Sequence, residues 1–301
     1  MSSSQDAPRP DDPAPRGSVS RRSLIIAGAS VAAAVAVGVA VPVLGGIQRR
    51  PGTLVSQMLA KQTFSVAHRG GSDDWPEMSL LAYQNAVNIG VDALEVSLAR
   101  TSDGIWFGLH DRTLDRTSGT TGFVASEHTW AEIVQHRISA SGTHDRAQPT
   151  QPYMRFQELI EAFAPTHAIF VDPKYVGAEH FHELFTAMGK IVDLPRQTFI
   201  AKSFHSSTEW AMDARARGFK TWGYYYASEF EADPSLFTKT QRSWDILGLD
   251  YQGSPAAWKA VRDFGKPVIA HTIPERRAAD VAEGLGARGL MISGVHEVLA
   301  G

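Results

Sequence analysis

Cysteine is absent from the 301 residues of this chain. Its absence excludes disulfide bonds, thiolate metal ligands and cysteine nucleophiles together. Any polar chemistry therefore depends on the eleven histidines, the carboxylates and the basic side chains. Hydrophobic residues make up 43% of the chain, which is enough for one sizeable core.

The chain also lacks a strong excess of charge of either sign. Its 29 Lys and Arg stand against 32 Asp and Glu, the formal net charge is -3, and no long run of Lys or Arg occurs. Proteins that bind nucleic acids concentrate positive charge on their surface. We therefore expect no nucleic-acid partner.

The first fifty residues differ from the rest in composition. Residues 1–23 are rich in Ser, Pro and Asp, which predicts a disordered polar leader, and this leader ends with the twin arginine Arg21 and Arg22. Residues 24–47 carry no charge. This order is typical of a twin-arginine export signal, and the uncharged stretch is also long enough to span a bilayer. A cleaved signal and a retained membrane anchor both stay open, and both place residues 51–301 outside the cytoplasm.

Residues 51–301 alternate between short apolar runs and helix-like segments. Runs suited to buried strands lie at residues 64–67, 93–98, 105–109, 168–171, 198–202, 220–225, 246–249, 268–271 and 289–292. Helix-like segments lie at residues 79–89, 156–164, 180–192, 206–217, 256–264 and 276–283. This alternation and the length predict an α/β fold, a (β/α)8 TIM barrel.

Nine apolar runs are one more than a (β/α)8 barrel needs. The gap between the second and third runs, residues 99–104, leaves no room for a crossover helix, so we expect a hairpin there. Residues 136–152 contain many turn-forming residues and read as a surface loop near the barrel mouth.

Polar side chains cluster at the ends of the first four runs. They are His68 and Arg69, Glu95 and Ser97, His110 and Asp111, and Asp172 and Lys174. In a (β/α)8 barrel the carboxyl ends of the strands form the active site, so these residues can converge. Because side chains two apart on a strand share a face, Glu95 and Ser97 should point the same way, as should Asp172 and Lys174.

These residue types suit the cleavage of a phosphodiester. Two imidazoles can act as general base and general acid, and carboxylates can hold a hard divalent cation. Arg69 and Lys174 would supply positive charge to the phosphoryl oxygens. Each histidine alone could equally be a structural residue, so the prediction depends on the joint pattern.

The same residues lie in segments that resemble the glycerophosphodiester phosphodiesterase family. The segments near the amino end are AHRGG at 67–71, WPEMSLLAY at 75–83, GVDALEVSLARTSDG at 90–104 and LHDRTLDRTSGTTG at 109–122. Later segments are MRFQELIEAF at 154–163, FVDPK at 170–174, KSF at 202–204, AHTI at 270–273 and GARGLMISG at 286–294. The resemblance covers most of residues 64–295.

The resemblance implies a (β/α)8 barrel that uses a divalent cation, Ca²⁺ or Mg²⁺, to hydrolyse glycerophosphodiesters to an alcohol and glycerol 3-phosphate. The implied roles are a catalytic pair, His68 as base and His110 as acid; metal ligands at Glu95, Asp172 and Glu77; and phosphate contacts at Arg69 and Lys174. The expected partner is a small or lipid-derived phosphodiester, and the oligomeric state is left open.

The chain departs from the family pattern at several of these positions. Ser97 stands where the family usually has Asp, which makes it a weak ligand, and Asp172 stands where it has Glu. Other differences are Met78 for Asn, His271 for Trp, and Ser293 with Gly294 for Thr-Asp. Asp172 followed by Lys174 also resembles the sphingomyelinase D-like phospholipases, so a phospholipase D-like enzyme on intact lipid is one alternative. A non-catalytic phosphodiester-binding protein is the other.

Overall fold

The computed structural model of the chain describes residues 54–301. The predicted leader (residues 1–23) and the predicted signal or membrane segment (residues 24–47) lie outside the described residues. Between residues 54 and 301, no helix combines the length and the apolar character needed to cross a membrane.

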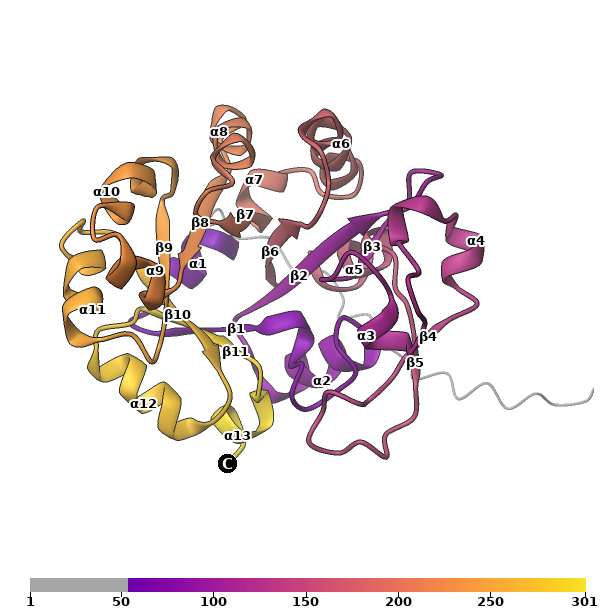
Figure 1. Cartoon of the computed structure of the whole chain (residues 1–301), viewed down its shortest axis with the longest axis horizontal. Coiled ribbons are helices and arrows are strands. Elements are labelled where there is room, and N and C mark those ends of the chain that lie inside the picture. Colours follow the sequence, from indigo (N-terminus) through magenta and orange to yellow (C-terminus); the bar gives the residue numbers. More distant parts are fainter. Residues whose placement is uncertain (1–53) are drawn as a thin grey trace, which may run out of the picture. The chain divides into compact units, whose positions relative to one another are not determined.

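Eight parallel strands close into a barrel, and helices surround it (Figure 1). The barrel strands are β1 (Phe64–Ala67), β2 (Ala93–Arg100), β6 (Ala168–Pro173), β7 (Phe199–Phe204), β8 (Lys220–Tyr225), β9 (Ile246–Asp250), β10 (Val268–Ile273) and β11 (Gly289–Ile292). Each pairs in parallel with the next, and β1 closes the circle by pairing with both β11 and β2. The predicted (β/α)8 barrel is confirmed.

The ninth strand forms the predicted hairpin. Strand β3 (Trp106–Gly108) runs antiparallel to β2, with Leu98 opposite Gly108. A separate two-stranded ladder joins β4 (Arg137–Ile138) to β5 (Gln151–Pro152) at the base of the loop predicted at residues 136–152. That ladder was not predicted, because two-residue strands leave no readable period.

The longer helices lie close to the predicted segments. They are α2 (Leu80–Ile89), α5 (Phe156–Phe163), α6 (Phe181–Ile191), α8 (Thr208–Ala216), α11 (Pro255–Arg262) and α12 (Arg276–Gly284). Short helices complete the described chain: α1 (Leu54–Leu59), α3 (Asp115–Ser118), α4 (Trp130–Ile133), α7 (Pro195–Thr198), α9 (Ala227–Ala232), α10 (Leu236–Thr240), α13 (Val295–Leu299), and the 3-10 turns η1 (His68–Gly70), η2 (Ala125–Glu127), η3 (Ala178–His180) and η4 (Gln241–Ser243).

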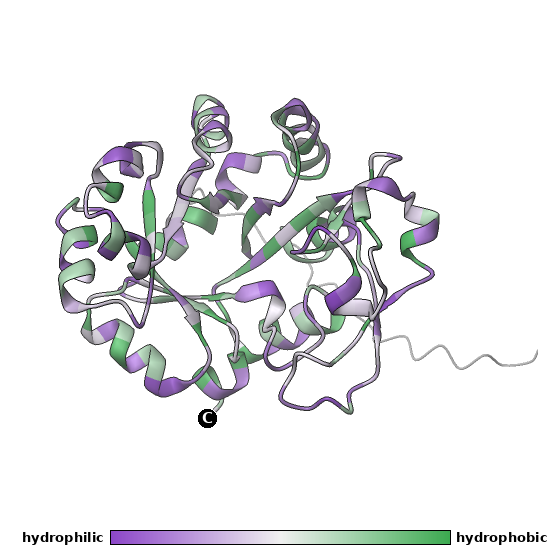
Figure 2. Cartoon of the chain, in the orientation of Figure 1, coloured by the Kyte–Doolittle hydropathy of each residue, from purple (hydrophilic) through white to green (hydrophobic). Residues whose placement is uncertain are grey.

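The core has two main parts, which follow the period of two along the strands. Side chains that point outward, such as Leu94 and Val171, pack with the helices. Side chains that point inward, such as Phe170 and Trp222, fill the barrel and pack with α1. Figure 2 shows the result: hydrophobic residues run along β2 and β9, whereas α12 carries hydrophilic and hydrophobic patches side by side.

Candidate active site

The turn after β1 brings a backbone donor to the centre of the barrel. Arg69 has φ 52°, in the left-handed region, and it is followed by Gly70 at φ 83°. A side chain at residue 70 would also clash, because its Cβ would lie 2.9 Å from the Cβ of Ala82. This turn directs the Arg69 N–H to Oε2 of Glu95 on β2, at 2.9 Å.

Four charged side chains, from β2, β6, the residue after β6 and β7, meet inside the barrel; we name Glu95, Asp172, Lys174 and Lys202 the central cluster. The Lys202 ammonium donates to Oε1 of Glu95 at 2.8 Å and to Oδ2 of Asp172 at 2.6 Å. Lys174 Nζ lies 2.8 Å from the same Asp172 oxygen and 2.8 Å from the Tyr224 hydroxyl. Both carboxylates are fully buried.

The charges of the central cluster stabilise one another. Burial alone would raise the pKa of Glu95, but the Lys202 ammonium and then the Arg69 guanidinium hold it below its usual value. Burial has the same effect at Asp172, where Lys174 and then Lys202 lower the pKa below its usual value. Burial would lower the pKa of Lys202, yet the two carboxylates raise it. All four groups are therefore charged at neutral pH.

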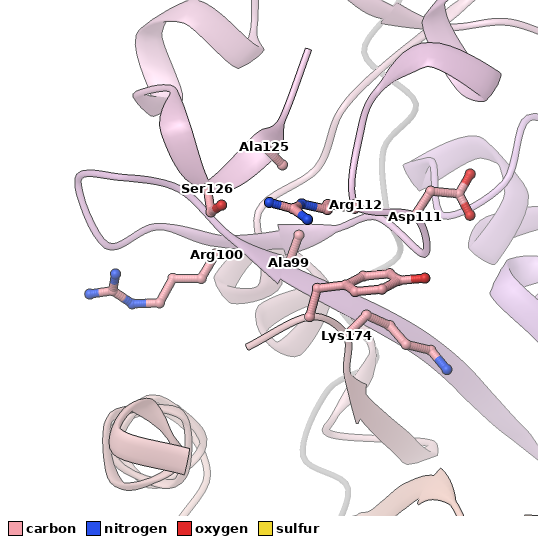
Figure 3. A pocket seen from close by; sticks show the side chains of 8 residues that line it. Ala99, Arg100, Asp111, Arg112, Ala125, Ser126 and Lys174 are labelled. Atoms are coloured by element: carbon pink, nitrogen blue, oxygen red, sulfur yellow. The ribbon is translucent and has the colours of Figure 1, made fainter. Parts of the chain in front are cut away.

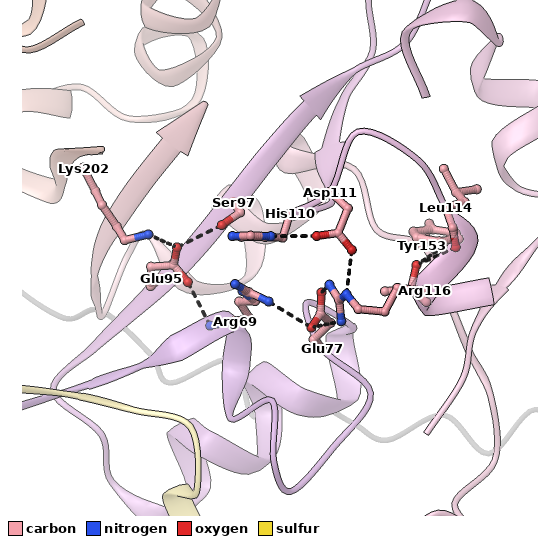
Figure 4. Close-up of polar contacts among 11 residues, drawn as sticks. Arg69, Glu77, Glu95, Ser97, His110, Asp111, Leu114, Arg116, Tyr153 and Lys202 are labelled. Carbon is pink, nitrogen blue, oxygen red and sulfur yellow. Dashed lines mark hydrogen bonds and ion pairs between the residues drawn. The ribbon is translucent and has the colours of Figure 1, made fainter. Parts of the chain in front are cut away.

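A second set of charges lies nearer the surface; we name His110, Asp111, Arg116 and Glu77 the rim cluster (Figure 4). His110 Nδ1 lies 2.8 Å from Oδ1 of Asp111, and Arg116 donates to the other oxygen of Asp111 at 2.6 Å. Arg116 also donates to both oxygens of Glu77, at 3.0 and 2.7 Å. Arg69 joins the two clusters, because its guanidinium donates to Glu77 at 3.3 Å.

His110 reaches the site by a route that the sequence did not indicate. Strand β3 runs against the barrel strands, so its carboxyl end does not lie at the carboxyl ends of the others. The hairpin instead leads the chain back along β2, where the N–H of Leu109 donates to the carbonyl oxygen of Ser97 at 3.0 Å. His110 follows directly and lines the same cavity as His68.

The two imidazoles differ in their surroundings. Burial, and then the positive charge of Arg69 and Lys202, holds the pKa of His68 well below its ordinary value. Burial also lowers the pKa of His110, but the hydrogen bond with Asp111 opposes this shift. His68 Nδ1 is buried and has no hydrogen-bond partner among the described residues. His68 is thus neutral at pH 7, as a general base must be.

The predicted ligands do not fit a divalent cation. Glu95 and Asp172 both face the Lys202 ammonium, and Ser97 offers a hydroxyl that donates to Glu95 at 3.2 Å. Both oxygens of Glu77 are taken by guanidinium groups. Within residues 54–301, no three His, Asp or Glu side chains gather as a cation site. Hard cations need several free oxygen ligands, and this arrangement does not supply them.

Two neighbouring cavities open at this end of the barrel, and Lys174 lines both. The first, of about 70 Å³, is lined by His68, Arg69, His110, Lys174, Lys202, Trp222, Tyr224, Tyr226, His271, Thr272 and Met291. The second, of about 270 Å³, lies beside it and is lined by Ala99, Arg100, Asp111, Arg112, Ala125, Ser126, Lys174 and Tyr175 (Figure 3). The smaller cavity has the size of a phosphate group and presents three basic side chains to it.

The structure brings most predicted residues together and adds others. His68, Arg69, His110 and Lys174 share one cavity, and Glu95, Ser97 and Asp172 lie beside it. Lys202, Arg116 and Tyr224 were not predicted from the sequence as site residues. Lys202 had a readable signal, because it stands two residues after the buried Ile200 on a predicted strand, as Asp172 does after Phe170. Arg116 had none, because it lies outside the predicted strands and its partner Glu77 is 39 residues away.

Comparisons with known proteins agree with the fold. The model of the glycerophosphoryl diester phosphodiesterase family matches residues 68–245. A glycerophosphodiester phosphodiesterase of Bacillus subtilis is 30% identical over 118 residues, which cover 36% of this chain and 39% of that protein. The human glycerophosphodiester phosphodiesterase 1 is 34% identical over 131 residues, covering 42% and 37%. The chain thus spans well under half the length of these curated relatives.

Solved structures with little sequence identity share the barrel. A glycerophosphodiester phosphodiesterase from Agrobacterium tumefaciens has a TM-score of 0.63 and 19% identity, covering 79% of this chain and all (100%) of that one. A phosphodiesterase from Oleispira antarctica, solved with its product sn-glycerol-3-phosphate, has a TM-score of 0.63 and 19% identity, covering 79% and 96%. At this identity the likeness shows the fold.

Proposed function

Because the chain belongs to the glycerophosphoryl diester phosphodiesterase family, we propose that it hydrolyses glycerophosphodiesters to an alcohol and glycerol 3-phosphate. The observation that carries this proposal is the small cavity that His68 and His110 share with the basic side chains of Arg69, Lys174 and Lys202. That combination provides proton transfer on both sides of a phosphoryl group together with positive charge to hold it.

The proposed step uses His68 and His110 on opposite sides of the reaction. His68, neutral at pH 7, takes a proton from the attacking water. His110 gives a proton to the oxygen of the departing alcohol. Burial lowers the pKa of His110, and the hydrogen bond with Asp111 opposes this shift and favours the protonated form. The bond between phosphorus and that oxygen breaks as the bond to water forms. Arg69 and Lys174 hold the phosphoryl oxygens, and their charge stabilises the negative charge that builds up there.

The larger cavity is the place for the alcohol part of the substrate. It adjoins Lys174 and Asp111, so a group that leaves past His110 enters it directly. Arg112 on its wall favours a polar or anionic headgroup, whereas the Arg100 guanidinium is paired with Glu183. The Ca²⁺ or Mg²⁺ that the family resemblance implies has no part in this step, because the donor set does not fit it.

A substrate panel tests the proposal. The full chain, purified in detergent, is incubated with glycerophosphocholine, glycerophosphoethanolamine, glycerophosphoglycerol and intact phospholipid vesicles, and glycerol 3-phosphate is measured. We expect release of glycerol 3-phosphate from at least one soluble diester. Release of headgroup from the vesicles alone would favour the phospholipase D-like alternative. Binding of the diesters without turnover would establish the non-catalytic binding protein instead.

We also propose that the enzyme acts outside the cytoplasm. The support is the order of Arg21 and Arg22 before the uncharged residues 24–47. Changing both arginines, Arg21→Lys with Arg22→Lys, should keep the protein inside the cell, as measured by fractionation. The matched control changes Arg49→Lys with Arg50→Lys, which lie after the apolar stretch and should leave export intact. Undiminished export of the first variant would contradict the proposal, and the size of the exported product separates cleavage from anchoring.

A further inference from the structure

A lysine side chain occupies the position between the two carboxylates that the sequence marks as metal ligands. Lys202 is only 4% exposed, and its Nζ lies 2.8 Å from Glu95 and 2.6 Å from Asp172. Its strand, β7, pairs with β6, which in turn pairs with β2. Three adjacent strands thus point one positive and two negative charges at one place inside the barrel.

We propose that the Lys202 ammonium replaces the divalent cation at this place, so that the phosphodiester cleavage proposed above proceeds without a metal ion. The inference rests on that proposed function for its reaction. The new element is that a side chain of this protein, Lys202, supplies the positive charge at the centre of the site.

Every carboxylate oxygen at this place already has a donor. Glu95 accepts from Lys202 and Ser97 on one oxygen and from the Arg69 N–H on the other. Asp172 accepts from Lys202 on one oxygen and from the Ser203 hydroxyl, at 3.1 Å, on the other. A cation could enter only by displacing Lys202, which would leave a buried ammonium without partners. Such a group is costly, so the cluster itself opposes metal binding.

The formal charges of the side chains at this place agree with the replacement of a divalent cation by the Lys202 ammonium. Ser97 is neutral where the family pattern has a third carboxylate, and Lys202 adds a positive charge beside it. Two carboxylates with one ammonium have the same formal net charge as three carboxylates around a divalent ion. The electrostatic field at the phosphate is therefore similar in sign, although it comes from a fixed side chain.

The position of Lys202 also suits contact with a phosphate. An ammonium has three N–H donors, and Glu95 and Asp172 accept two of them, which leaves one for a phosphoryl oxygen. Lys202 lines the small cavity together with Arg69, Lys174, His68 and His110. The centres of the Trp222 and Tyr224 rings lie 5.6 and 5.0 Å from Nζ, so both rings stabilise the ammonium by cation–π contact.

Metal binding and chelator resistance of the unmodified chain are the first test. The full chain is stripped with EDTA and titrated with Mn²⁺ up to about 1 mM, the range of weak protein sites, with bound ion followed by electron paramagnetic resonance. We expect no bound Mn²⁺, and turnover in EDTA within about twofold of turnover in added Ca²⁺, Mg²⁺ or Mn²⁺. Stoichiometric Mn²⁺ binding, or activity that EDTA abolishes and metal restores, would overturn the proposal.

Variants at residues 97 and 202 are the second test. Ser97→Asp combined with Lys202→Ser restores the third carboxylate and removes the ammonium, so this double variant should bind Mn²⁺. Ser97→Asp alone keeps the ammonium and should bind none. Equal Mn²⁺ binding by the two variants would show that the Lys202 ammonium does not prevent metal binding.

The single variant Lys202→Gln should lose at least about a hundredfold in turnover. The matched control Lys220→Gln removes a lysine at the start of the next strand, β8, whose side chain is 53% exposed, and should retain full activity. Circular dichroism checks that Lys202→Gln folds. If it does not, the measurements on the unmodified chain still decide.

The two proposals can fail separately. If no substrate of the panel is turned over with or without metal, the proposed hydrolysis is wrong, and the Mn²⁺ titration still decides whether Lys202 takes the place of the cation. If turnover is found but requires metal, the hydrolysis stands and the replacement is wrong.

Discussion

The two ends of the barrel interior are built by the same strands yet differ completely in character. At the closed end, beside α1, the inward side chains are apolar, among them Val66, Phe170 and Ile200. Two residues further along the chain stand His68, directly after β1, and Asp172 and Lys202 on β6 and β7. Inward-facing positions only two residues apart therefore carry packed apolar side chains at one position and polar or charged side chains at the next. This contrast teaches that each strand contributes to stability at one level and to chemistry at the next.

The contrast predicts different outcomes for substitutions at the two levels. Changes at the closed end should lower stability, because they open a cavity in close-packed surroundings. Changes at the other end, which holds His68, Asp172 and Lys202 and which we name the open end, should lower turnover. They should affect stability less, except where they leave a buried charge without a partner.

The largest expected effect is at the closed end. Phe170 is fully buried and packs edge-on against Trp222, with ring centres 5.6 Å apart. Phe170→Ala should lower the free energy of unfolding by about 3–5 kcal/mol, because the removed ring leaves a cavity. Urea denaturation measures this loss. The exposed Met212→Ala on α8, with 64% exposure, is the control and should change stability little. A stable Phe170→Ala protein would break the comparison.

The next effect is at the open end. His68→Ala and His110→Ala should each lower turnover by at least about a hundredfold, or roughly 2.7 kcal/mol in activation free energy, if they act as base and acid. Their unfolding free energies should stay close to that of the unmodified chain. Steady-state kinetics and urea denaturation on the same samples check both statements. His182→Ala, on the outer helix α6, serves as the control. Near-normal turnover in both site variants would remove the assignment.

A smaller effect is expected from the carboxylate that supports His110. Both imidazoles have pKa values below their ordinary value in the free protein, His68 the lower. The pH profile of kcat/KM should therefore peak below about pH 6.5 and fall about tenfold per pH unit above it, as His110 loses its proton. The measured profile tests the sign directly, since a maximum above pH 8 would contradict it.

Asp111→Asn should move this profile without unfolding the protein. The Asp111 carboxylate raises the pKa of His110, so its loss should shift the alkaline limb to lower pH and reduce kcat/KM about tenfold at neutral pH. Asp213→Asn, which breaks a surface ion pair between Asp213 on α8 and Arg217 just after this helix, is the control. A drop in activity at every pH with an unshifted limb would assign Asp111 a purely structural role.

The smallest effect is expected at Ser97. Its hydroxyl makes one hydrogen bond to Glu95, whose oxygens keep Lys202 and Arg69 as stronger donors. Ser97→Ala should lower turnover by less than about threefold and unfolding free energy by about 1 kcal/mol. Kinetics and denaturation measure both. A large loss of turnover would show that the hydroxyl contacts the substrate, and it would add Ser97 to the residues of the open end that take part in the chemistry.

Much of the fold could be predicted because its period is local. Each barrel strand coincides with an apolar run within two residues at either end, and the hairpin between β2 and β3 followed from a gap too short for a helix. The short elements, such as α7 and the ladder of β4 and β5, could not be predicted, because a four-residue helix is about one turn long and a two-residue strand shows no alternation.

The sequence by itself determined which side chains face the barrel interior and which of these are charged, because that depends only on alternation along each strand. The tertiary structure decided which charges pair. Lys202 lies 107 residues from Glu95 and 30 from Asp172, and only the pairing of β2, β6 and β7 brings them together. A carboxylate that reads as a metal ligand in the sequence is an ion-pair partner here, because its role depends on which charge lies nearest in space.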